Sequence, residues 1–453
     1  MMKQIFPGSA FFGAPVRSHE LAYLINCIQR GWCCSVVGPS NTGKSHLLKS
    51  LTSETIRQRC AQDGLAPTMV FIDCLEAGDD ELAFYELLFR RIIEALELSD
   101  AEPTVLDYLT SLHQDILRSR QDVVARSNFA SGIRELGRRG GPPLVLVLDE
   151  FYDVFQHLPP WPFRQLRALY DAPETQIYLV TATSHHLEQL RPGKEVYEFR
   201  ELFHLRELVL KPLVEDEAHQ LIEYLTDQYR DSLSTENAER LIELSGGHPG
   251  LLERLYSVAT LSQTDLNVPL DLPLADLLHE RAIHKECLRL WRELEAEHEA
   301  LVTLIERGAD QLNSAQRQLL EYKGLMVDKG YPAIFSPVFG AFIAAKQAHA
   351  PSSQSTGLRA EAETGRIWID DEELTLKLSE PQRRLIDYLY RRAGVVCTYD
   401  EIAIGVWGVG EGVSPGAIYE LVKRVRQKVE PDWKNPQYIV TVPGKGYRLE
   451  NPS

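Results

Sequence analysis

The stretch Gly38-Pro39-Ser40-Asn41-Thr42-Gly43-Lys44-Ser45 decides how the first half of this chain folds. It follows an apolar run, Cys34–Val37, which is typical of a buried strand, and it opens a stretch with helical periodicity, Ser45–Arg59. Its glycines allow the backbone to turn tightly, so that successive amides and the amino end of the following helix can surround an anion. The stretch therefore predicts a phosphate-binding loop between a strand and a helix.

The spacing of this loop matches the Walker A pattern in full. In that pattern the Lys44 amine reaches the β- and γ-phosphates of a nucleotide, and the Ser45 hydroxyl binds Mg²⁺. We therefore predict ATP and Mg²⁺ as cofactors. The expected nucleotide-binding residues of the loop are consecutive: Gly38, Pro39, Ser40, Asn41, Thr42, Gly43, Lys44, Ser45 and His46.

A second motif, Leu144-Val145-Leu146-Val147-Leu148-Asp149-Glu150, matches Walker B and places two carboxylates directly after an apolar strand. A buried strand of a parallel sheet delivers such groups to its carboxyl edge, beside the phosphates. We expect Asp149 to bind the nucleotide's Mg²⁺ through water, which makes Ser45 and Asp149 the predicted metal site. Glu150 is expected to orient and deprotonate the attacking water, so Glu150 and Lys44 are predicted catalytic residues.

Two further positions are candidates that each have a plain structural alternative. The strand Ile177–Thr181 leads into Thr183 and Ser184, and Thr183 is the preferred catalytic candidate for a contact to the γ-phosphate. The alternative for Thr183 is an ordinary capping hydroxyl at a strand end. Residues 245–250 read Ser-Gly-Gly-His-Pro-Gly, where His248 is a candidate nucleotide-binding residue and the alternative is a tight turn between two helices.

Strand-like runs alternate with helical stretches through the first half of the chain, which favours a parallel sheet covered on both faces. The other expected strands are Thr68–Asp73 and Glu207–Lys211, and the pattern becomes helical from residue 215. We therefore predict a multidomain chain. Its parts are an α/β P-loop NTPase core at 1–213, a helical lid subdomain at 214–280, a helical or winged-helix-like unit at 281–347, a linker at 348–362 and an α+β winged helix at 363–453.

Near the C-terminus, the predicted helix Ser414–Val429 has two different faces. One face is apolar, and the other carries Glu420 and four cations: Lys423, Arg424, Arg426 and Lys428. Such a helix can pack on a core and face phosphates at the same time, and a plain solvated face is the alternative. Residues 438–449 predict two strands that turn at Gly444-Lys445-Gly446, with a basic tip suited to a phosphate or a minor groove.

The 453-residue chain is acidic, with a net charge of −17, but the charge is uneven. Residues 361–453 carry 13 Lys and Arg against 15 Asp and Glu, which leaves 35 against 50 in residues 1–360. An acidic body repels DNA, so DNA binding would depend on local contacts, a specific site or an oligomer. The seven cysteines include no Cys-x-x-Cys pair, which predicts reduced thiols rather than a zinc cluster. We see neither a secretory signal nor a long apolar run, and expect a cytoplasmic protein without a membrane partner.

The order of motifs in residues 10–346 resembles the STAND group of AAA+-related signalling ATPases. The shared features are Walker A, Walker B with Asp-Glu, a threonine at a strand end, Lys211-Pro212-Leu213 and the Gly-Gly-His-Pro stretch. The segment from Phe12-Gly13 to Glu20-Leu21 is similar to that family's entry to the P-loop. Ala14 stands where the family has arginine, which weakens any inference about adenine contacts at that position.

In that family the nucleotide acts mainly as a switch. The resemblance implies a closed ADP form that opens on exchange to ATP and oligomerises, with His248 sensing the phosphates. Residues 299–346, with Phe335-Ser336-Pro337, look like the family's own winged-helix appendage. Arg200 and Arg206 are candidates for an arginine finger, and surface salt bridges are the alternative.

Residues 363–450 closely resemble the OmpR/PhoB-type winged helix of bacterial response regulators. The hallmarks are Val-Trp-Gly at 406–408, Arg-x-Lys at 426–428 and Thr-Val-x-Gly-x-Gly-Tyr-Arg-Leu at 441–449. The resemblance implies that the third helix enters the major groove of double-stranded DNA, and that the loop Val409–Val413 is the turn that contacts RNA polymerase. The implied base readers are Tyr419, Glu420 and Lys423, and the implied phosphate contacts are Arg424, Arg426, Lys428 and Lys445. No receiver domain precedes this module, so control by a phosphoaspartate is not predicted.

These features together favour an ATP-binding, nucleotide-switched transcription regulator that hydrolyses ATP slowly and forms a nucleotide-dependent homo-oligomer. Two alternatives stay open at this point. The first is a DNA-stimulated AAA+ ATPase that acts in DNA transactions or defence. The second is a scaffold switch whose terminal winged helix binds protein, which predicts no salt-sensitive DNA affinity.

Overall fold

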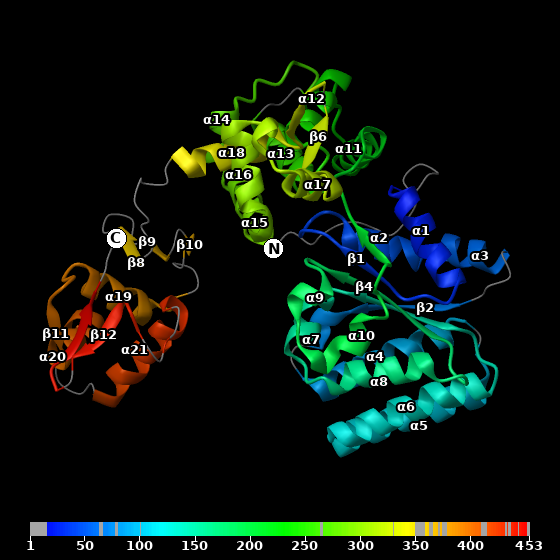
Figure 1. Cartoon of the computed structure of the whole chain (residues 1–453). Helices are drawn as coiled ribbons and strands as arrows, with labels where there is room; N and C mark the ends of the chain where they lie inside the picture. The colour runs from blue at the N-terminus through cyan, green and yellow to red at the C-terminus, as the bar shows by residue number, and fades with distance from the viewer. Residues whose placement is uncertain are drawn as a thin grey trace. The chain divides into compact units, whose positions relative to one another are not determined.

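The computed structural model forms two compact units, residues 1–345 and residues 346–453, and each is described here by itself (Figure 1). The structure describes residues 16–62, 67–77, 80–99, 101–262, 266–328, 330–348, 358–361, 366–369, 372–373, 378–408, 415–430, 433, 436–442 and 444–450. The predicted entry at Phe12-Gly13-Ala14, most of the predicted linker and the loop Val409–Val413 lie outside these residues.

The first unit contains a five-stranded parallel sheet with the strand order β2-β3-β4-β1-β5. The strands are β1 (Cys34–Val37), β2 (Thr68–Asp73), β3 (Leu144–Asp149), β4 (Ile177–Thr183) and β5 (Glu207–Val209). The predicted α/β fold with a parallel sheet is therefore confirmed. Because β3, β4 and β1 are adjacent and parallel, the carboxyl ends of all three strands lie at one edge of the sheet.

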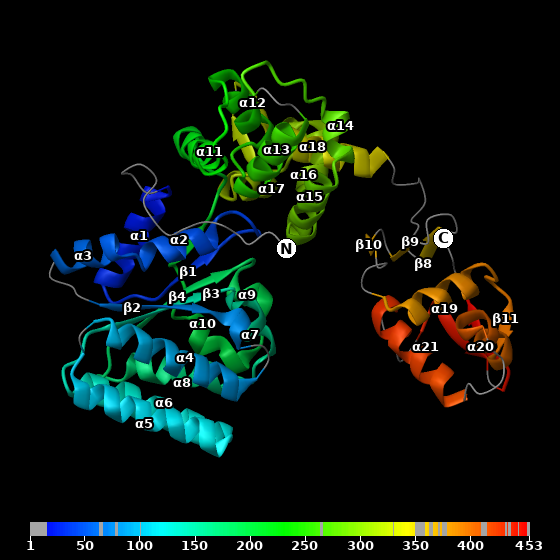
Figure 2. The ribbon, with the colours of Figure 1, turned by 180° about the vertical axis from the view of Figure 1, so that it is seen from behind.

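Helices cover both faces of this sheet (Figures 1 and 2). One face is covered by α1 (Ser18–Gln29), α2 (Lys44–Leu51) and α3 (Glu54–Gln62); the other is covered by α4 (Glu81–Glu97), α5 (Pro103–Ser119), α6 (Asp122–Arg138), α7 (Phe151–His157), α8 (Trp161–Asp171), α9 (Leu187–Leu190) and α10 (Tyr197–Arg200). Strand β3 feeds both layers, since Val145 and Val147 join one core while Leu144, Leu146 and Leu148 join the other. The single helix predicted over 45–59 is two helices, and α6 and α7 were not predicted.

The rest of the first unit is mostly helical. Its elements are α11 (Glu215–Tyr229), α12 (Thr235–Ser245), α13 (Pro249–Ser262), α14 (Leu274–His279), α15 (Arg281–Glu293), α16 (His298–Arg307), α17 (Ser314–Tyr322), the hairpin β6 (Met326–Asp328) and β7 (Pro332–Ile334), and α18 (Pro337–Ala348). One hydrophobic core runs from Leu213 to Ile343. The predicted lid and the predicted winged-helix-like unit thus share a core across residue 280.

The second unit is an α+β winged helix, as predicted. It contains β8 (Leu358–Glu361), β9 (Arg366–Ile369), β10 (Glu372–Glu373), α19 (Glu380–Tyr390), β11 (Val396–Thr398), α20 (Tyr399–Trp407), α21 (Pro415–Val429), β12 (Ile439–Val442) and β13 (Gly446–Leu449). Two antiparallel sheets have the orders β10-β9-β8 and β11-β13-β12. A capping box between Ser379 and Gln382 starts α19, and Gly408, in the left-handed region, ends α20.

Across the described parts of both units, every helix is too short or too polar to span a bilayer. The seven cysteines are all buried free thiols.

Candidate nucleotide site and candidate DNA-binding face

The loop after β1 has the geometry that a phosphate-binding loop needs. Gly43 lies in the left-handed region with φ of 94° and directly precedes α2, a conformation that glycine adopts without strain. The Gly38 amide donates to the Thr183 carbonyl on the neighbouring strand (3.2 Å), and the Thr42 hydroxyl donates to the Pro39 carbonyl (2.7 Å). These bonds fix the loop at the carboxyl edge of the sheet before any phosphate binds.

Lys44 is buried, and its amine donates to carbonyls of its own loop. The bonds from Nζ to the oxygens of Gly38 and Pro39 are 2.7 and 2.9 Å long. Burial lowers the pKa of Lys44, and the nearby carboxylates of Glu150, Glu293 and Asp149 raise it. An incoming phosphate therefore has to replace carbonyl partners of this amine.

Asp149, at the end of β3, is buried beside Ser45. The Ser45 hydroxyl bonds to the Asp149 carboxylate, while the Oδ1 atom has no hydrogen-bond partner among the described residues. Burial raises the pKa of Asp149, and the bond from Ser45 lowers it. A buried carboxylate oxygen without a partner, next to a hydroxyl, fits the oxygen ligands that Mg²⁺ prefers.

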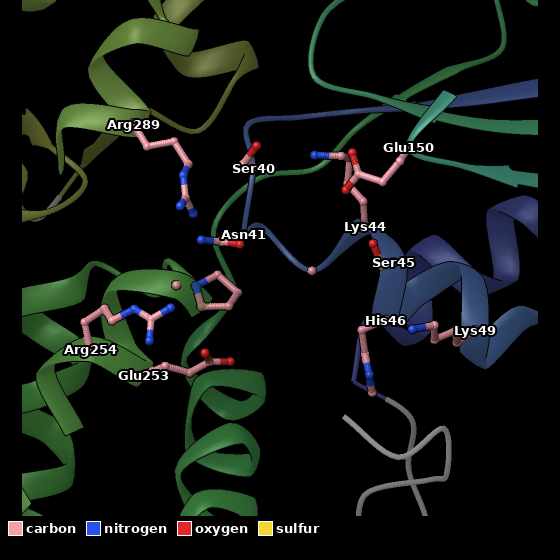
Figure 3. Close-up of a pocket in the computed structure, with 13 residues that line it drawn as sticks. Ser40, Asn41, Lys44, Ser45, His46, Lys49, Glu150, Glu253, Arg254 and Arg289 are labelled. Atoms are coloured by element: carbon pink, nitrogen blue, oxygen red, sulfur yellow. The ribbon is translucent and has the colours of Figure 1, made fainter. Parts of the chain in front are cut away.

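Glu150 follows at a strained position, since its φ is 49°. Partial burial raises its pKa, with Asp149, Asp73 and Glu293 acting in the same direction, and Lys44 lowers it. The side chain lines the cavity beside Lys44 (Figure 3). This geometry suits a group that orients a water molecule near the terminal phosphate.

A cavity of about 190 Å³ lies over the loop (Figure 3). Its lining comes from the P-loop, from the end of β3 and from two helices of the helical region, α13 and α15: Ser40, Asn41, Gly43, Lys44, Ser45, His46, Lys49, Glu150, Pro249, Gly250, Glu253, Arg254 and Arg289. Burial raises the pKa of Glu253 to about 7, with Arg254 opposing. The predicted site residues include none of those that α13 and α15 contribute; the predicted residue His248 directly precedes α13.

Helix α15 contacts the P-loop through two glutamates. The Glu293 carboxylate accepts hydrogen bonds from the Ser40 amide and the Ser40 hydroxyl, both 2.5 Å long. The Glu286 carboxylate is buried and accepts two bonds from the Asn41 side-chain amide, at 2.8 and 3.0 Å. Glu286, Arg289 and Glu293 recur at a spacing that places them on one face of the helix.

Arg17 is a residue of the site that the sequence predictions missed. It is buried, and its Nη2 donates to the carbonyls of Thr42 (2.7 Å) and Lys211 (2.8 Å), while Nη1 pairs with Glu20 (3.1 Å). Arg17 thus joins the P-loop to the segment that follows β5. The sequence feature that could have identified Arg17 is its position three residues before Glu20-Leu21.

A smaller apolar cavity of about 30 Å³ adjoins the first and shares Gly43, His46 and Pro249 with it. Val16, Leu213 and Leu221 provide the apolar walls; Arg17 and Thr42 complete the lining. Burial lowers the pKa of His46 to about 4, so its imidazole is neutral at physiological pH.

His248 is buried behind the cavity, next to the lining residues Pro249 and Gly250. Its Nδ1 accepts the Leu251 amide (3.2 Å), so Nε2 carries the proton, and Nε2 lacks a partner among the described residues. Burial lowers the pKa of His248 to about 3, helped by the charges of Arg17, Lys44 and Arg289. The structure thus places a neutral donor near the loop, and its phosphate-sensing role stays a prediction.

The glycines around His248 lie in a tight turn between α12 and α13, which was the alternative interpretation of this stretch. A Cβ on Gly247, whose φ is 76°, would lie 2.2 Å from the Leu213 carbonyl oxygen, and one on Gly246, whose φ is 60°, would lie 2.0 Å from that of Phe335. A Cβ on Gly250 would lie 2.6 Å from both Asn41 and Glu286. Glycine is therefore required here by close backbone approach.

The remaining candidates of the first unit lie away from the cavity lining. The Thr183 hydroxyl donates to the His185 carbonyl (2.8 Å), and the Ser184 hydroxyl contacts the His185 ring (2.9 Å). Arg206 precedes β5, at the edge opposite the P-loop, and lies over the Trp32 ring. Arg200 ends α10 and lies over the Tyr197 ring. Their catalytic roles stay predictions.

In the second unit, α21 has the two faces expected from its sequence. Ile418, Val422, Val425 and Val429 are buried in the core of the unit. On the opposite face Tyr419 and Arg424 are exposed, and Lys423 lies 3.6 Å from Glu420. Lys445 is exposed at the tip of the β12–β13 hairpin.

Two of the predicted phosphate contacts have partners within the unit. Arg426 donates three hydrogen bonds to β12, two to the Ile439 carbonyl (2.9 and 2.6 Å) and one to the Thr441 hydroxyl (2.7 Å). Burial lowers its pKa. The Lys428 amine donates to the Gln382 side chain (3.0 Å). The guanidinium of Arg426 thus holds α21 to the hairpin, and its expected role as a phosphate contact stays a prediction.

Comparison with known proteins identifies the second unit. Residues 371–449 match the family described as "Transcriptional regulatory protein, C terminal", and this segment belongs to that family. The sensory transduction protein RegX3 of Mycobacterium leprae is 37% identical over 98 residues, which cover 22% of this chain and 48% of that protein. The alkaline phosphatase synthesis transcriptional regulatory protein SphR of Synechococcus elongatus is 34% identical over 93 residues, covering 20% and 35%. The chain spans less than half the length of these relatives.

Among solved structures, the chain is similar to several proteins at low sequence identity. A Walker-type ATPase of Pyrococcus abyssi gives a TM-score of 0.45 at 15% identity, over 72% of this chain and 95% of that one. The ADP form of the ORC2 protein of Aeropyrum pernix gives a TM-score of 0.43 at 14% identity, over 77% and 97%. The P-loop fold is assigned from the strand order and loop geometry of this chain itself.

Proposed function

We propose that the chain is an ATP-binding transcription regulator whose binding to double-stranded DNA is switched by the nucleotide, with slow hydrolysis that resets the switch. The observation that carries this proposal is one chain with both parts: Lys44, Ser45, Asp149 and Glu150 at one edge of a parallel sheet, and a transcriptional-regulator domain at the other end.

At the nucleotide site, the P-loop amides and Lys44 would hold the phosphates, and Ser45 and Asp149 would hold Mg²⁺. The bound Mg²⁺ would neutralise charge on the terminal phosphates. Glu150 would orient the attacking water and accept its proton. The apolar residues Val16, Leu213 and Leu221 beside the loop would face the base.

At the DNA end, α21 would enter the major groove, with Tyr419, Lys423 and Arg424 on its exposed face and Lys445 at the hairpin tip. Because these cations would displace counterions from the DNA phosphates, we expect DNA affinity to fall as the salt concentration rises. The turn Val409–Val413 would contact RNA polymerase. A homo-oligomer would supply several DNA contacts at once, which would offset the repulsion between DNA and the acidic first unit.

The test measures the affinity for genomic promoter fragments selected for binding by the native chain, in MgATP and in MgADP. The native chain should show at least a fivefold difference between the two nucleotides. Lys44→Ala should abolish that difference, and Arg424→Ala should weaken binding in both. If all three proteins bind any duplex equally well, the proposal is wrong, and a DNA-stimulated ATPase without sequence preference becomes the better account.

A further inference from the structure

Helix α15 contacts the P-loop through one of its faces. Glu293 accepts both the amide and the hydroxyl hydrogen of Ser40, and Glu286 accepts the side-chain amide of Asn41. Ser40 and Asn41 belong to the loop whose amides surround phosphate oxygens in a P-loop. A carboxylate therefore already binds where the loop offers donors to an anion.

The electrostatic neighbours of Glu293 locate it within the site. Its charge raises the pKa of Lys44, whose pKa is lowered overall by burial. Its charge also raises the pKa of Glu150, after the larger effect of partial burial. Lys44 and Glu150 are the residues assigned to the terminal phosphate and to the attacking water, so the charge that is bonded to Ser40 also acts on these two residues.

We propose that the Glu293 carboxylate is a built-in substitute for the γ-phosphate, and that it makes this closed form select ADP over ATP. The inference rests on the proposed nucleotide-binding function. The two Ser40 donors can serve one anion, and a γ-phosphate beside Glu293 would place like charges in contact in a partly buried site. ADP lacks that phosphate and leaves the contact intact.

Two further contacts join the helical region to the P-loop. The buried Glu286 has its amide partner on the P-loop, and the Gly250 amide of α13 donates to the Asn41 carbonyl (3.1 Å). These contacts border the cavity of about 190 Å³ over the loop. ATP binding therefore requires α15 to leave Ser40, and departure of Glu293 couples the third phosphate to a movement of the helical region.

Glu293→Gln tests the inference because it removes the charge and keeps a side chain that can accept the Ser40 amide. The probes are MgADP and Mg²⁺ with the non-hydrolysable ATP analogue AMP-PNP, titrated calorimetrically into the full chain. The matched control is Glu295→Gln, which removes the same charge from an exposed side chain two residues further on. We expect Glu293→Gln to tighten AMP-PNP binding at least about tenfold, with MgADP changed less than about threefold and the control like the native chain.

The outcomes separate this inference from the function on which it rests. If the native chain binds both nucleotides and Glu293→Gln changes neither affinity, the inference is wrong and the proposed function stands. If the variant tightens both nucleotides equally, Glu293 is a general lock and does not discriminate the γ-phosphate. If neither the native chain nor the variant binds either nucleotide, the proposed function itself fails.

Discussion

The two candidate binding regions use their cations in opposite ways. At the P-loop, Lys44 is buried, bonds to loop carbonyls and lies beneath an acidic helix face. On the winged helix, Arg424 and Lys445 are exposed. The difference teaches that the nucleotide site is closed and needs a rearrangement, whereas the candidate DNA face is ready for contact. Control of such a chain would then act at the first site.

The largest expected effect concerns a close backbone contact next to His248, between Gly247 and Leu213. Gly247→Ala places a Cβ 2.2 Å from the Leu213 oxygen at a φ of 76°, and we expect a loss of about 3 kcal/mol or more in unfolding free energy. Gly330→Ala is the control: its φ is 87°, but a Cβ there meets nothing within 4 Å, so the loss should be about 1 kcal/mol. Urea denaturation measures both. Equal losses would mean that the region around Gly247 relaxes easily, which would weaken the contrast between the two regions.

The second expected effect is a dependence of the stability of the first unit on pH. The pKa of His248 is about 3 in the folded chain and about 6.5 when unfolded. Between these values the unfolded chain binds a proton that the folded chain excludes, so stability is highest above pH 6.5 and falls as the pH decreases toward 3. At pH 5 the loss from this residue is about 2 kcal/mol.

His248→Asn removes this titration and keeps an acceptor for the Leu251 amide, so the variant should lose about 2 kcal/mol less than the native chain between pH 7 and pH 5. His204→Asn alters an exposed histidine, retains His248 and should keep the native pH dependence. Urea denaturation at the two pH values gives the comparison. Parallel curves for the native chain and His248→Asn would show that His248 is protonated without difficulty in the folded state.

The smallest effects separate two arginines of α21. Arg426→Ala removes the bonds to Ile439 and Thr441 and should lower the stability of the second unit by about 1–2 kcal/mol. Arg424→Ala changes an exposed side chain and should stay within about 0.5 kcal/mol, while lowering the salt slope of DNA binding by about one. Thermal unfolding and salt titrations measure the two quantities. If Arg424→Ala destabilised the unit more than Arg426→Ala, their assigned roles would be reversed.

The fold was predicted from local sequence patterns. The strands Cys34–Val37 and Thr68–Asp73 have the bounds predicted from the sequence, because an apolar run is a signal that acts over a few residues. The Walker motifs were predictable for the same reason. The helix α6 was missed because its apolar positions are interrupted by small and charged residues.

Contacts between distant segments were not predictable. Ser40 and Glu293 are 253 positions apart, and Asn41 and Glu286 are 245 apart, so no local pattern joins them. The contacts of Arg426 within the unit were missed for a related reason: its spacing places it on the exposed face of α21, but its long side chain reaches back to β12. The periodicity of the sequence predicts on which face of a helix a residue lies, whereas the tertiary fold determines which atoms the end of its side chain contacts.

The most direct test of the central claim uses reciprocity between the two ends of the chain. If ATP and ADP change DNA affinity by some factor, saturating DNA must change the ratio of their dissociation constants by the same factor. We predict that a selected promoter duplex shifts the AMP-PNP to ADP ratio by at least about fivefold in the native chain, measured calorimetrically. An identical ratio with and without the duplex would contradict the account, because the nucleotide site and the DNA-binding face would then be independent.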